Sequence, residues 1–242
     1  MLKKIETRII PEETDRSFYL QHLKAYSFVR DNVDDKSVLD VGCGDGYGSA
    51  YLAERAKFVQ GVDYEPEVVL SAQKKYKADN LRYLAMDALK LEFKDQEFDI
   101  VCSFQVIEHL PEELISVYLN ELKRVLKDKG TLYLSTLNLD KVMKSPKTYK
   151  KNPAHCKEFR LEELRETLLK FFKKVTIYGQ HLSLRHYFYL RLKKSGFFRF
   201  FPSCFNPVEI FSKNIRINDY RLNLSRLKDA SDFICVCKKT NL

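Results

Sequence analysis

Glycines recur at alternate positions in one short segment of the chain, Val38–Gly48, which reads VLDVGCGDGYG. Gly42, Gly44 and Gly46 follow a run of apolar and β-branched residues that is typical of a strand. Glycine lets the backbone turn sharply and a ligand approach closely, and a helix that begins just after the loop points its N-terminus at that ligand. The dinucleotide-binding pattern G-x-G-x-x-G is not matched, because its last position would be a tyrosine or a serine. The loop therefore predicts a ligand site of another kind.

Aspartates stand at the ends of the first three apolar runs. Asp40 lies two residues before Gly42, where a carboxylate would repel a pyrophosphate and favour a cationic ligand. Asp63 closes the second run, where an acidic side chain can accept hydrogen bonds from both hydroxyls of a ribose. Asp87 follows the third run, where a carboxylate could meet an exocyclic amine. Together they predict a pocket for a nucleoside with a positive charge, and S-adenosylmethionine (SAM), with its sulfonium and ammonium groups, fits this description.

The elements that must position these residues alternate between strand and helix, and this spacing predicts a parallel, doubly wound α/β sheet. The expected strands are residues 37–42, 57–63, 81–85, 98–104, 130–136, 173–179 and 232–239. The expected helices are residues 14–33, 47–56, 65–78, 111–127 and 160–172. We expect a single domain, residues 1–242, with a seven-stranded, mostly parallel sheet whose last strand is antiparallel. An N-terminal helix and an insert at residues 180–231 should cover the acceptor side of the site.

Residues 37–138 resemble the class I SAM-dependent methyltransferases, a family with a Rossmann-like fold. VLDVGCGDGYGS is similar to the first motif of that family, GVD to its second-strand acidic motif, MDAL to its adenine-facing motif and FDIVCSFQVIEHL to its fourth-strand motif. The phrases RIIPE, NPAHCKEF and YGQ resemble a bacterial and archaeal subgroup whose members often act on sugars of surface glycans or on related small molecules.

The resemblance implies a set of cofactor-binding residues. Asp40, Gly42, Gly44 and Gly46 would shape the methionine end of the site. Asp63 would hold the ribose, and Tyr64 belongs to the same cofactor-binding set. The remaining members are Asp87 and Ala88 at the adenine and Phe104 and Gln105 beside the sulfonium.

A hydroxyl acceptor of the methyl group needs a base, because it is a poor nucleophile while protonated. Glu108 and His109 follow the fourth expected strand, at the sheet edge where ligands bind, and His109 is the first candidate base. The alternative is that His109 only caps or packs the helix that begins near Pro111. His155 is the second candidate, in a loop whose lysines would favour a negatively charged acceptor, unless it is simply a surface histidine.

Some relatives, among them ubiquinone-pathway and small-RNA methyltransferases, carry the motif E-x-x-E-H here and bind a divalent metal through it. This chain has Gln105, Glu108 and His109 at the corresponding positions. Loss of the first carboxylate removes charge that a hard cation such as Mg²⁺ favours, so we expect no metal.

The formal charge of +9 is unevenly distributed: residues 1–140 carry a net −6 and residues 141–242 a net +15. The basic half includes a segment rich in aromatic residues, 185–211. Such a segment could dock an anionic, lipid-linked substrate at a membrane surface, stack single-stranded bases, or form a helical lid. No signal peptide or membrane span is apparent, and six cysteines without a C-x-x-C pair indicate a reduced, cytoplasmic setting.

The sequence therefore predicts a SAM-dependent methyltransferase that modifies a hydroxyl, or else an amine, of a sugar or other small metabolite. Two alternatives stay open. One is an RNA methyltransferase recruited by the basic half of the chain, and the other is a non-catalytic SAM-binding scaffold.

Overall fold

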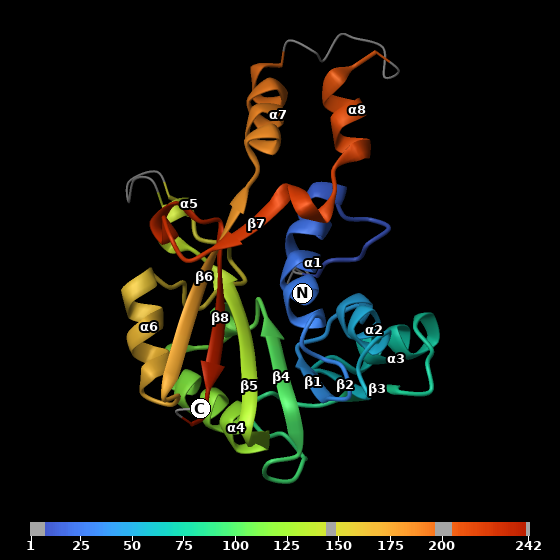
Figure 1. Cartoon of the computed structure of the whole chain (residues 1–242), viewed down its shortest axis with the longest axis vertical. Coiled ribbons are helices and arrows are strands. Elements are labelled where there is room, and N and C mark those ends of the chain that lie inside the picture. Colours follow the sequence, from blue (N-terminus) through green and yellow to red (C-terminus); the bar gives the residue numbers. More distant parts are fainter. Residues whose placement is uncertain (1–7, 144–148, 197–204, 241–242) are drawn as a thin grey trace.

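An eight-stranded mixed sheet forms the centre of the protein in the computed structural model, which describes residues 8–143, 149–196 and 205–240 (Figure 1). The strand order is β3-β2-β1-β4-β5-β8-β6-β7. The strands are β1 (Ser37–Val41), β2 (Phe58–Asp63), β3 (Leu81–Ala85), β4 (Phe98–Phe104), β5 (Leu126–Leu137), β6 (Lys174–Leu182), β7 (Tyr220–Asn223) and β8 (Asp232–Lys238). The first five strands pair in parallel, and β8 is antiparallel to both β5 and β6. The predicted doubly wound α/β fold with an antiparallel last strand is confirmed.

The prediction of seven strands was one short, because β7 pairs with the outer edge of β6 within the insert. This strand has only four residues, and Tyr220 is the one fully buried side chain among them. A segment this short has too few alternating positions to be distinguished from a loop by its pattern.

Helices cover both faces of the sheet. On one face lie α1 (Arg16–Arg30), α2 (Tyr47–Ala53) and α3 (Pro66–Lys75), and on the other α4 (Ile115–Val125) and α6 (Leu161–Leu169). A short helix, α5 (Leu139–Val142), follows β5. The insert contains α7 (Leu184–Ser195) and α8 (Pro207–Asn214), which extend away from the sheet at one end of the molecule (Figure 1).

Local signals explain where the helices begin. The carboxylate of Asp15 accepts hydrogen bonds from the amides of Ser17 and Phe18 and so caps α1. Pro66 occupies the first turn of α3. The helix expected at 111–127 is shorter, because residues 112–114 form a 3₁₀ turn and the chain joins β5 at Leu126.

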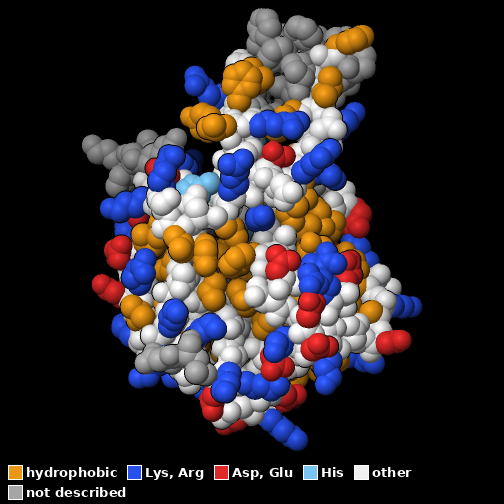
Figure 2. Space-filling view, viewed as in Figure 1, with side chains coloured by type: hydrophobic (Ala, Val, Ile, Leu, Met, Phe, Trp, Pro, Cys, Tyr) orange, Lys and Arg blue, Asp and Glu red, His pale blue; other side chains and the backbone are white. Residues whose placement is uncertain are grey.

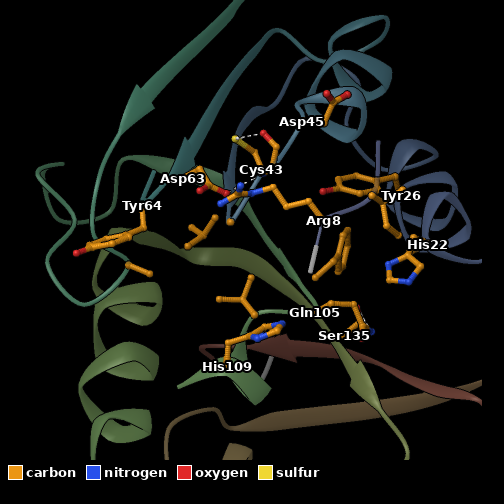
Figure 3. A pocket seen from close by; sticks show the side chains of 18 of the residues that line it. Arg8, His22, Tyr26, Cys43, Asp45, Asp63, Tyr64, Gln105, His109 and Ser135 are labelled. Atoms are coloured by element: carbon orange, nitrogen blue, oxygen red, sulfur yellow. Dashed lines mark hydrogen bonds between the residues drawn. The ribbon is translucent and has the colours of Figure 1, made fainter. Parts of the chain in front are cut away.

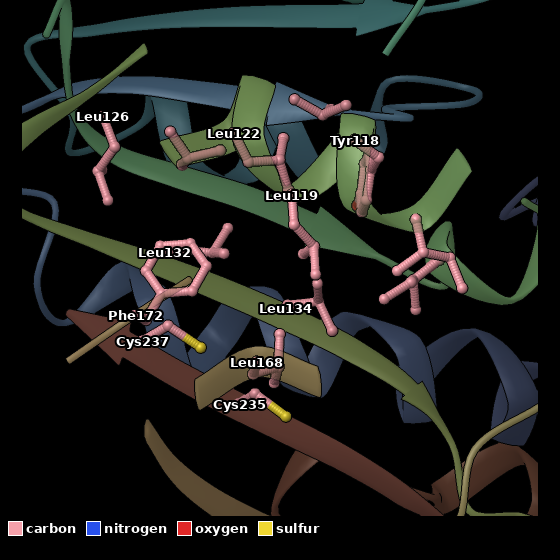
Figure 4. Close-up of a cluster of buried hydrophobic side chains, with 14 of the residues drawn as sticks. Tyr118, Leu119, Leu122, Leu126, Leu132, Leu134, Leu168, Phe172, Cys235 and Cys237 are labelled. Carbon is pink, nitrogen blue, oxygen red and sulfur yellow. The ribbon is translucent and has the colours of Figure 1, made fainter. Parts of the chain in front are cut away.

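Alternation along the strands divides the core into two clusters. Leu39 and Val41 face the layer of α4 and α6, where they join the side chains shown in Figure 4. Val38 points to the opposite face, toward α1 and α2. Cys235 and Cys237 are fully buried on the α4 and α6 face. The described cysteines are all free.

Candidate functional site

The glycine loop joins β1 to α2 at the carboxyl edge of the sheet. The amide of Gly42 donates to the carbonyl of Val62 on β2 at 2.8 Å, which holds the loop against the neighbouring strand. Gly44 has a φ of +54°, in the left-handed region that favours glycine. A Cβ atom at Gly44 would meet no heavy atom within 4 Å, so a side chain there would project into open space. The predicted turn is present, and it leaves room for a ligand beside the backbone.

The space beside the loop is part of a cavity of about 500 Å³ at the carboxyl ends of the parallel strands. Figure 3 shows Asp63, Tyr64, Tyr26 and His109 projecting around it. Of the residues predicted to contact a cofactor or acceptor, those that line it are Gly42, Gly44, Asp63, Tyr64, Asp87, Ala88, Phe104, Gln105 and His109. The structure therefore gathers nine of the predicted residues around one cavity.

Backbone amides orient the carboxylates of Asp63 and Asp87. One oxygen of Asp63 accepts from the amide of Gly44 at 2.9 Å, and the other accepts from the amide of Glu65 at 3.1 Å. Asp87 accepts from the amide of Leu89 at 2.9 Å. Each carboxylate is held at the end of its strand and keeps further lone pairs for a ligand.

The lining of the cavity is rich in acidic groups. Among the described residues that line it, Asp45, Asp63, Glu65, Asp87 and Asp232 carry carboxyl groups. In this described lining Arg8 is the one arginine or lysine, and it pairs with Glu65 at 2.5 Å. Asp45 pairs at 2.9 Å with Lys75, which lies outside the lining, so the acidic character of the cavity comes chiefly from Asp63 and Asp87. Such a lining favours a cationic ligand.

Asp40 does not lie at the mouth of the cavity, where the sequence placed it. Its side chain is fully buried and accepts hydrogen bonds from the hydroxyls of Ser49, at 2.6 Å, and Tyr26, at 3.2 Å. Burial raises the pKa of this carboxyl to about 7. Asp40 therefore ties the tyrosine that lines the cavity to α2. Gly46, the residue that caps α2, is also absent from the lining.

His109 faces the cavity beside Gln105 and Ser135 (Figure 3). Its Nδ1 atom lies 3.0 Å from the carbonyl oxygen of Ala154. A proton on Nδ1 makes this hydrogen bond and leaves Nε2 as an acceptor. Burial lowers the pKa of the ring, so the imidazole is neutral at pH 7.

Glu108 and His155 lie behind His109 and do not line the cavity. Glu108 is fully buried because it points from the turn after β4 toward Thr136 of β5, whose hydroxyl donates to it at 3.1 Å. Burial raises the pKa of Glu108 to about 8, and its Oε1 atom has no hydrogen-bond partner among the described residues. The ring of His155 packs edge-on against that of His109, and its Nδ1 atom lies 2.7 Å from Glu158. His155 is therefore placed to support His109 and does not reach the cavity.

Glu108, His109 and His155 each offer one ligand atom, and these atoms lie within 4.8 Å of one another. One carboxylate and two imidazoles form a donor set that suits a divalent transition metal better than Mg²⁺. Among the described residues, this is the one group of three or more His, Cys, Asp or Glu side chains that lie close enough together to hold a metal ion.

Comparison with known proteins identifies the domain that carries this cavity. The family described as "Methyltransferase domain" matches residues 39–134, the segment that contains the glycine loop and the strand ends around it. The predicted resemblance of this segment to SAM-dependent methyltransferases is thus confirmed as a match to that domain.

Several proteins are similar to this methyltransferase domain. The "Probable S-adenosylmethionine-dependent methyltransferase" of Mycolicibacterium smegmatis is 32% identical over 163 residues, which cover 66% of this chain and 61% of that protein. The "Ubiquinone biosynthesis O-methyltransferase" of Pseudomonas fluorescens is 33% identical over 124 residues, half of each chain. A SAM-dependent methyltransferase from Archaeoglobus fulgidus shares the fold, with a TM-score of 0.63, 20% identity and coverage of 93% of this chain and 94% of that one. The chain thus matches about three fifths of the length of the first of these relatives.

The cavity also has walls that the sequence did not reveal. From α1, Gln21 and His22 line it, and burial lowers the pKa of His22 to about 4. Gln180 of β6 and Asp232 of β8 complete this wall. The side-chain amide of Gln21 donates to the carboxyl of Asp232 at 2.6 Å. These residues are far apart in the sequence, and no spacing pattern connects them. One feature of the sequence indicated this wall: the helix predicted at residues 14–33, which carries Gln21 and His22, was expected on the acceptor side of the site.

The described residues of the insert do not form the predicted cover over the cavity. Between residues 180 and 231, Gln180 is the one described residue in its lining. The lysines of the loop around His155 that were expected to attract a negative acceptor are also outside it: Lys150, Lys151 and Lys157 do not line the cavity, and Lys147 lies outside the described residues. No described helix is long and apolar enough to cross a membrane.

Proposed function

We propose that this chain transfers the methyl group of SAM to a hydroxyl of a sugar or another small metabolite. The fit of SAM rests on the open space beside Gly44 and on the acidic lining. Gly42 and Gly44 would hold the methionine end, Asp63 the ribose and Asp87 the adenine, with Phe104 and Gln105 near the sulfonium. When bound, SAM supplies a methyl group that is already activated for displacement by its sulfonium.

His109 is the base in this proposal. Its ring is neutral at pH 7 and faces the cavity. Because Nδ1 makes the hydrogen bond to the carbonyl of Ala154, Nε2 stays available to accept a proton. A hydroxyl bound near Gln105 and Ser135 would give its proton to Nε2 as its oxygen accepts the methyl group. Alignment of the two reactants supplies the other large contribution, up to roughly 7–11 kcal/mol in well-oriented systems.

The polar wall opposite the cofactor residues would recognise the acceptor. Gln21, Gln180 and Asp232 present amide and carboxyl groups, which can donate and accept hydrogen bonds with hydroxyls. The acidic lining of the cavity as a whole supports a neutral, hydroxyl-bearing acceptor better than the negatively charged acceptor expected from the loop lysines. The relative from Pseudomonas fluorescens is named as an O-methyltransferase, which agrees with an oxygen acceptor.

The observation that carries the proposal is the imidazole of His109, which faces a cavity whose other walls carry the oriented carboxylates of Asp63 and Asp87. The test is incubation of the full chain with methyl-labelled SAM and fractionated small-molecule extract, followed by identification of the labelled product. Calorimetry with SAM runs in parallel on the wild type and on Asp63→Ala. We expect SAM binding that Asp63→Ala weakens, and label in a hydroxyl-bearing small molecule.

Three results would contradict the proposal in different ways. SAM binding below detection, unchanged in Asp63→Ala, would remove the enzyme function. SAM binding without methyl transfer to any fraction would favour the scaffold. Label in RNA, with an affinity that falls steeply with salt, would support the RNA methyltransferase.

A further inference from the structure

The two helices of the insert form a projection that the methyl-transfer chemistry does not explain. Helices α7 and α8 extend beyond the body of the protein (Figure 1), and none of their described residues lines the cavity. At the base of α7, His186 is buried, and its Nε2 atom lies 3.0 Å from the hydroxyl of Ser17 on α1. The guanidinium of Arg185 lies 4.9 Å above the ring of Phe211, which links α7 to α8. The projection is therefore anchored to the body.

One face of α7 exposes large apolar side chains. Leu184, Tyr187 and Phe188 are 89%, 58% and 63% exposed. Their spacing, i, i+3 and i+4, places them on one side of the helix. Ile210 of α8 is 46% exposed. Exposed apolar side chains that gather on one face of a helix mark a contact site.

Basic side chains accompany these apolar groups. Arg191 continues the face of α7 at i+7, and it is exposed, as are Lys194 and Lys213. None of these three forms an ion pair with any residue in the described part of the chain. Residues 184–216 contain seven basic residues and one acidic residue, Glu209. Orange and blue side chains share the projecting part of the molecule in Figure 2.

We propose that this surface, formed by Leu184, Tyr187, Phe188, Arg191, Lys194, Ile210 and Lys213, docks the protein on an anionic phospholipid bilayer. The apolar groups enter the boundary between headgroups and acyl chains, and the basic groups contact lipid phosphates. Tyr187 and Phe188 offer faces on which bases can stack, but the aliphatic Leu184 and Ile210 do not. A mixture of aliphatic, aromatic and basic side chains suits the boundary of an anionic bilayer better than single-stranded RNA. The proposal goes beyond methyl transfer and does not depend on it.

Vesicle co-sedimentation of the full chain tests the proposal, with phosphatidylcholine vesicles prepared with and without phosphatidylglycerol. We expect binding to the anionic vesicles alone, weakened by salt. The double variant Arg191→Glu/Lys194→Glu should lose affinity by about tenfold or more, since each basic residue near the membrane surface contributes about 1 kcal/mol. Phe188→Ser should also weaken binding, because it removes an apolar contact without changing charge.

Lys74→Glu/Lys77→Glu is the matched control, because it makes the same charge change on exposed lysines of α3 and the loop that follows it. This control should bind vesicles nearly as the wild type does. All variants should melt as the wild type does, which shows that they are folded. Equal loss in both double variants would overturn the proposal, since net charge alone would then explain binding. Absence of binding to anionic vesicles would overturn it too, and salt-sensitive binding to single-stranded RNA in its place would assign the surface to nucleic acid.

Discussion

Replacement of Gly44 by alanine tests whether the glycine loop holds a ligand or only turns the chain. The φ of +54° lies in the left-handed region, which costs a residue with a Cβ about 1–2 kcal/mol. For a domain of this length such a loss lowers Tm by about 2–8 °C. The added methyl group meets no protein atom within 4 Å, so the fold itself imposes no further steric penalty.

The methyl group would instead occupy the space that we assign to the cofactor. Overpacking of a close contact by one methyl group costs about 1–3 kcal/mol. That range corresponds to roughly a 5- to 150-fold increase in the Kd for SAM. Gly44→Ala should therefore bind SAM more weakly by this factor, measured by calorimetry at 25 °C beside a thermal melt.

Gly196→Ala is the matched control. Gly196 has a φ of +68°, and a Cβ there would also meet nothing within 4 Å, but it follows α7 outside the cavity. It should carry a similar backbone cost while SAM affinity stays unchanged. Wild-type affinity in Gly44→Ala, together with the expected loss of stability, would refute the placement of SAM against this loop.

Further predictions concern the residues around the cavity. Gly48→Ala would place a Cβ 2.0 Å from the ring of Tyr26, so we expect a loss of about 1–3 kcal/mol in the free energy of unfolding, measured in urea. His109→Ala should keep SAM affinity and lose turnover by about 10²- to 10⁴-fold; unchanged turnover would leave this histidine a packing role. Burial raises the folded pKa of Glu108 from 4.5 to about 8, so the protonated form is favoured in the fold and stability falls as pH rises through this interval. Glu108→Gln should remove that decline. In urea melts, the free energy of unfolding of the variant should exceed the wild-type value by more at pH 9 than at pH 6. Treatment with EDTA should leave turnover unchanged, and a loss reversed by added Zn²⁺ or Mn²⁺ would assign Glu108 and His109 to a metal site.

Local patterns were sufficient to predict the fold. The seven predicted strands are all present, because each is an apolar run of at least five residues bounded by turn or helix signals. The alternation of strands with helices fixed the parallel sheet, and it brought Asp63, Asp87 and His109 to one edge. The strand β7 was not predicted because four residues carry too little pattern.

The acceptor wall could not be predicted because it is assembled by tertiary packing. His22 comes from α1, Gln180 from β6 and Asp232 from β8, and only the antiparallel pairing of β6 with β8 brings the last two side by side. No motif records that pairing. The position of His155 could not be predicted for a related reason. The loop that carries it turns its ring onto His109 and Glu158, and the sequence does not specify that path.

The buried position of Asp40 follows from the geometry of its strand. Side chains alternate along a strand, so Asp40 must share a face with Val38, which packs under α1 and α2. A carboxylate on that face is buried, and it requires donors, which Tyr26 and Ser49 supply. The cationic selectivity inferred from this residue therefore has to come from Asp63, Asp87 and the other lining carboxylates. Asp40 contributes by fixing the tyrosine ring that closes one side of the cavity, and a neutral Asn at this position should preserve the electrostatics of the cavity while loosening that ring.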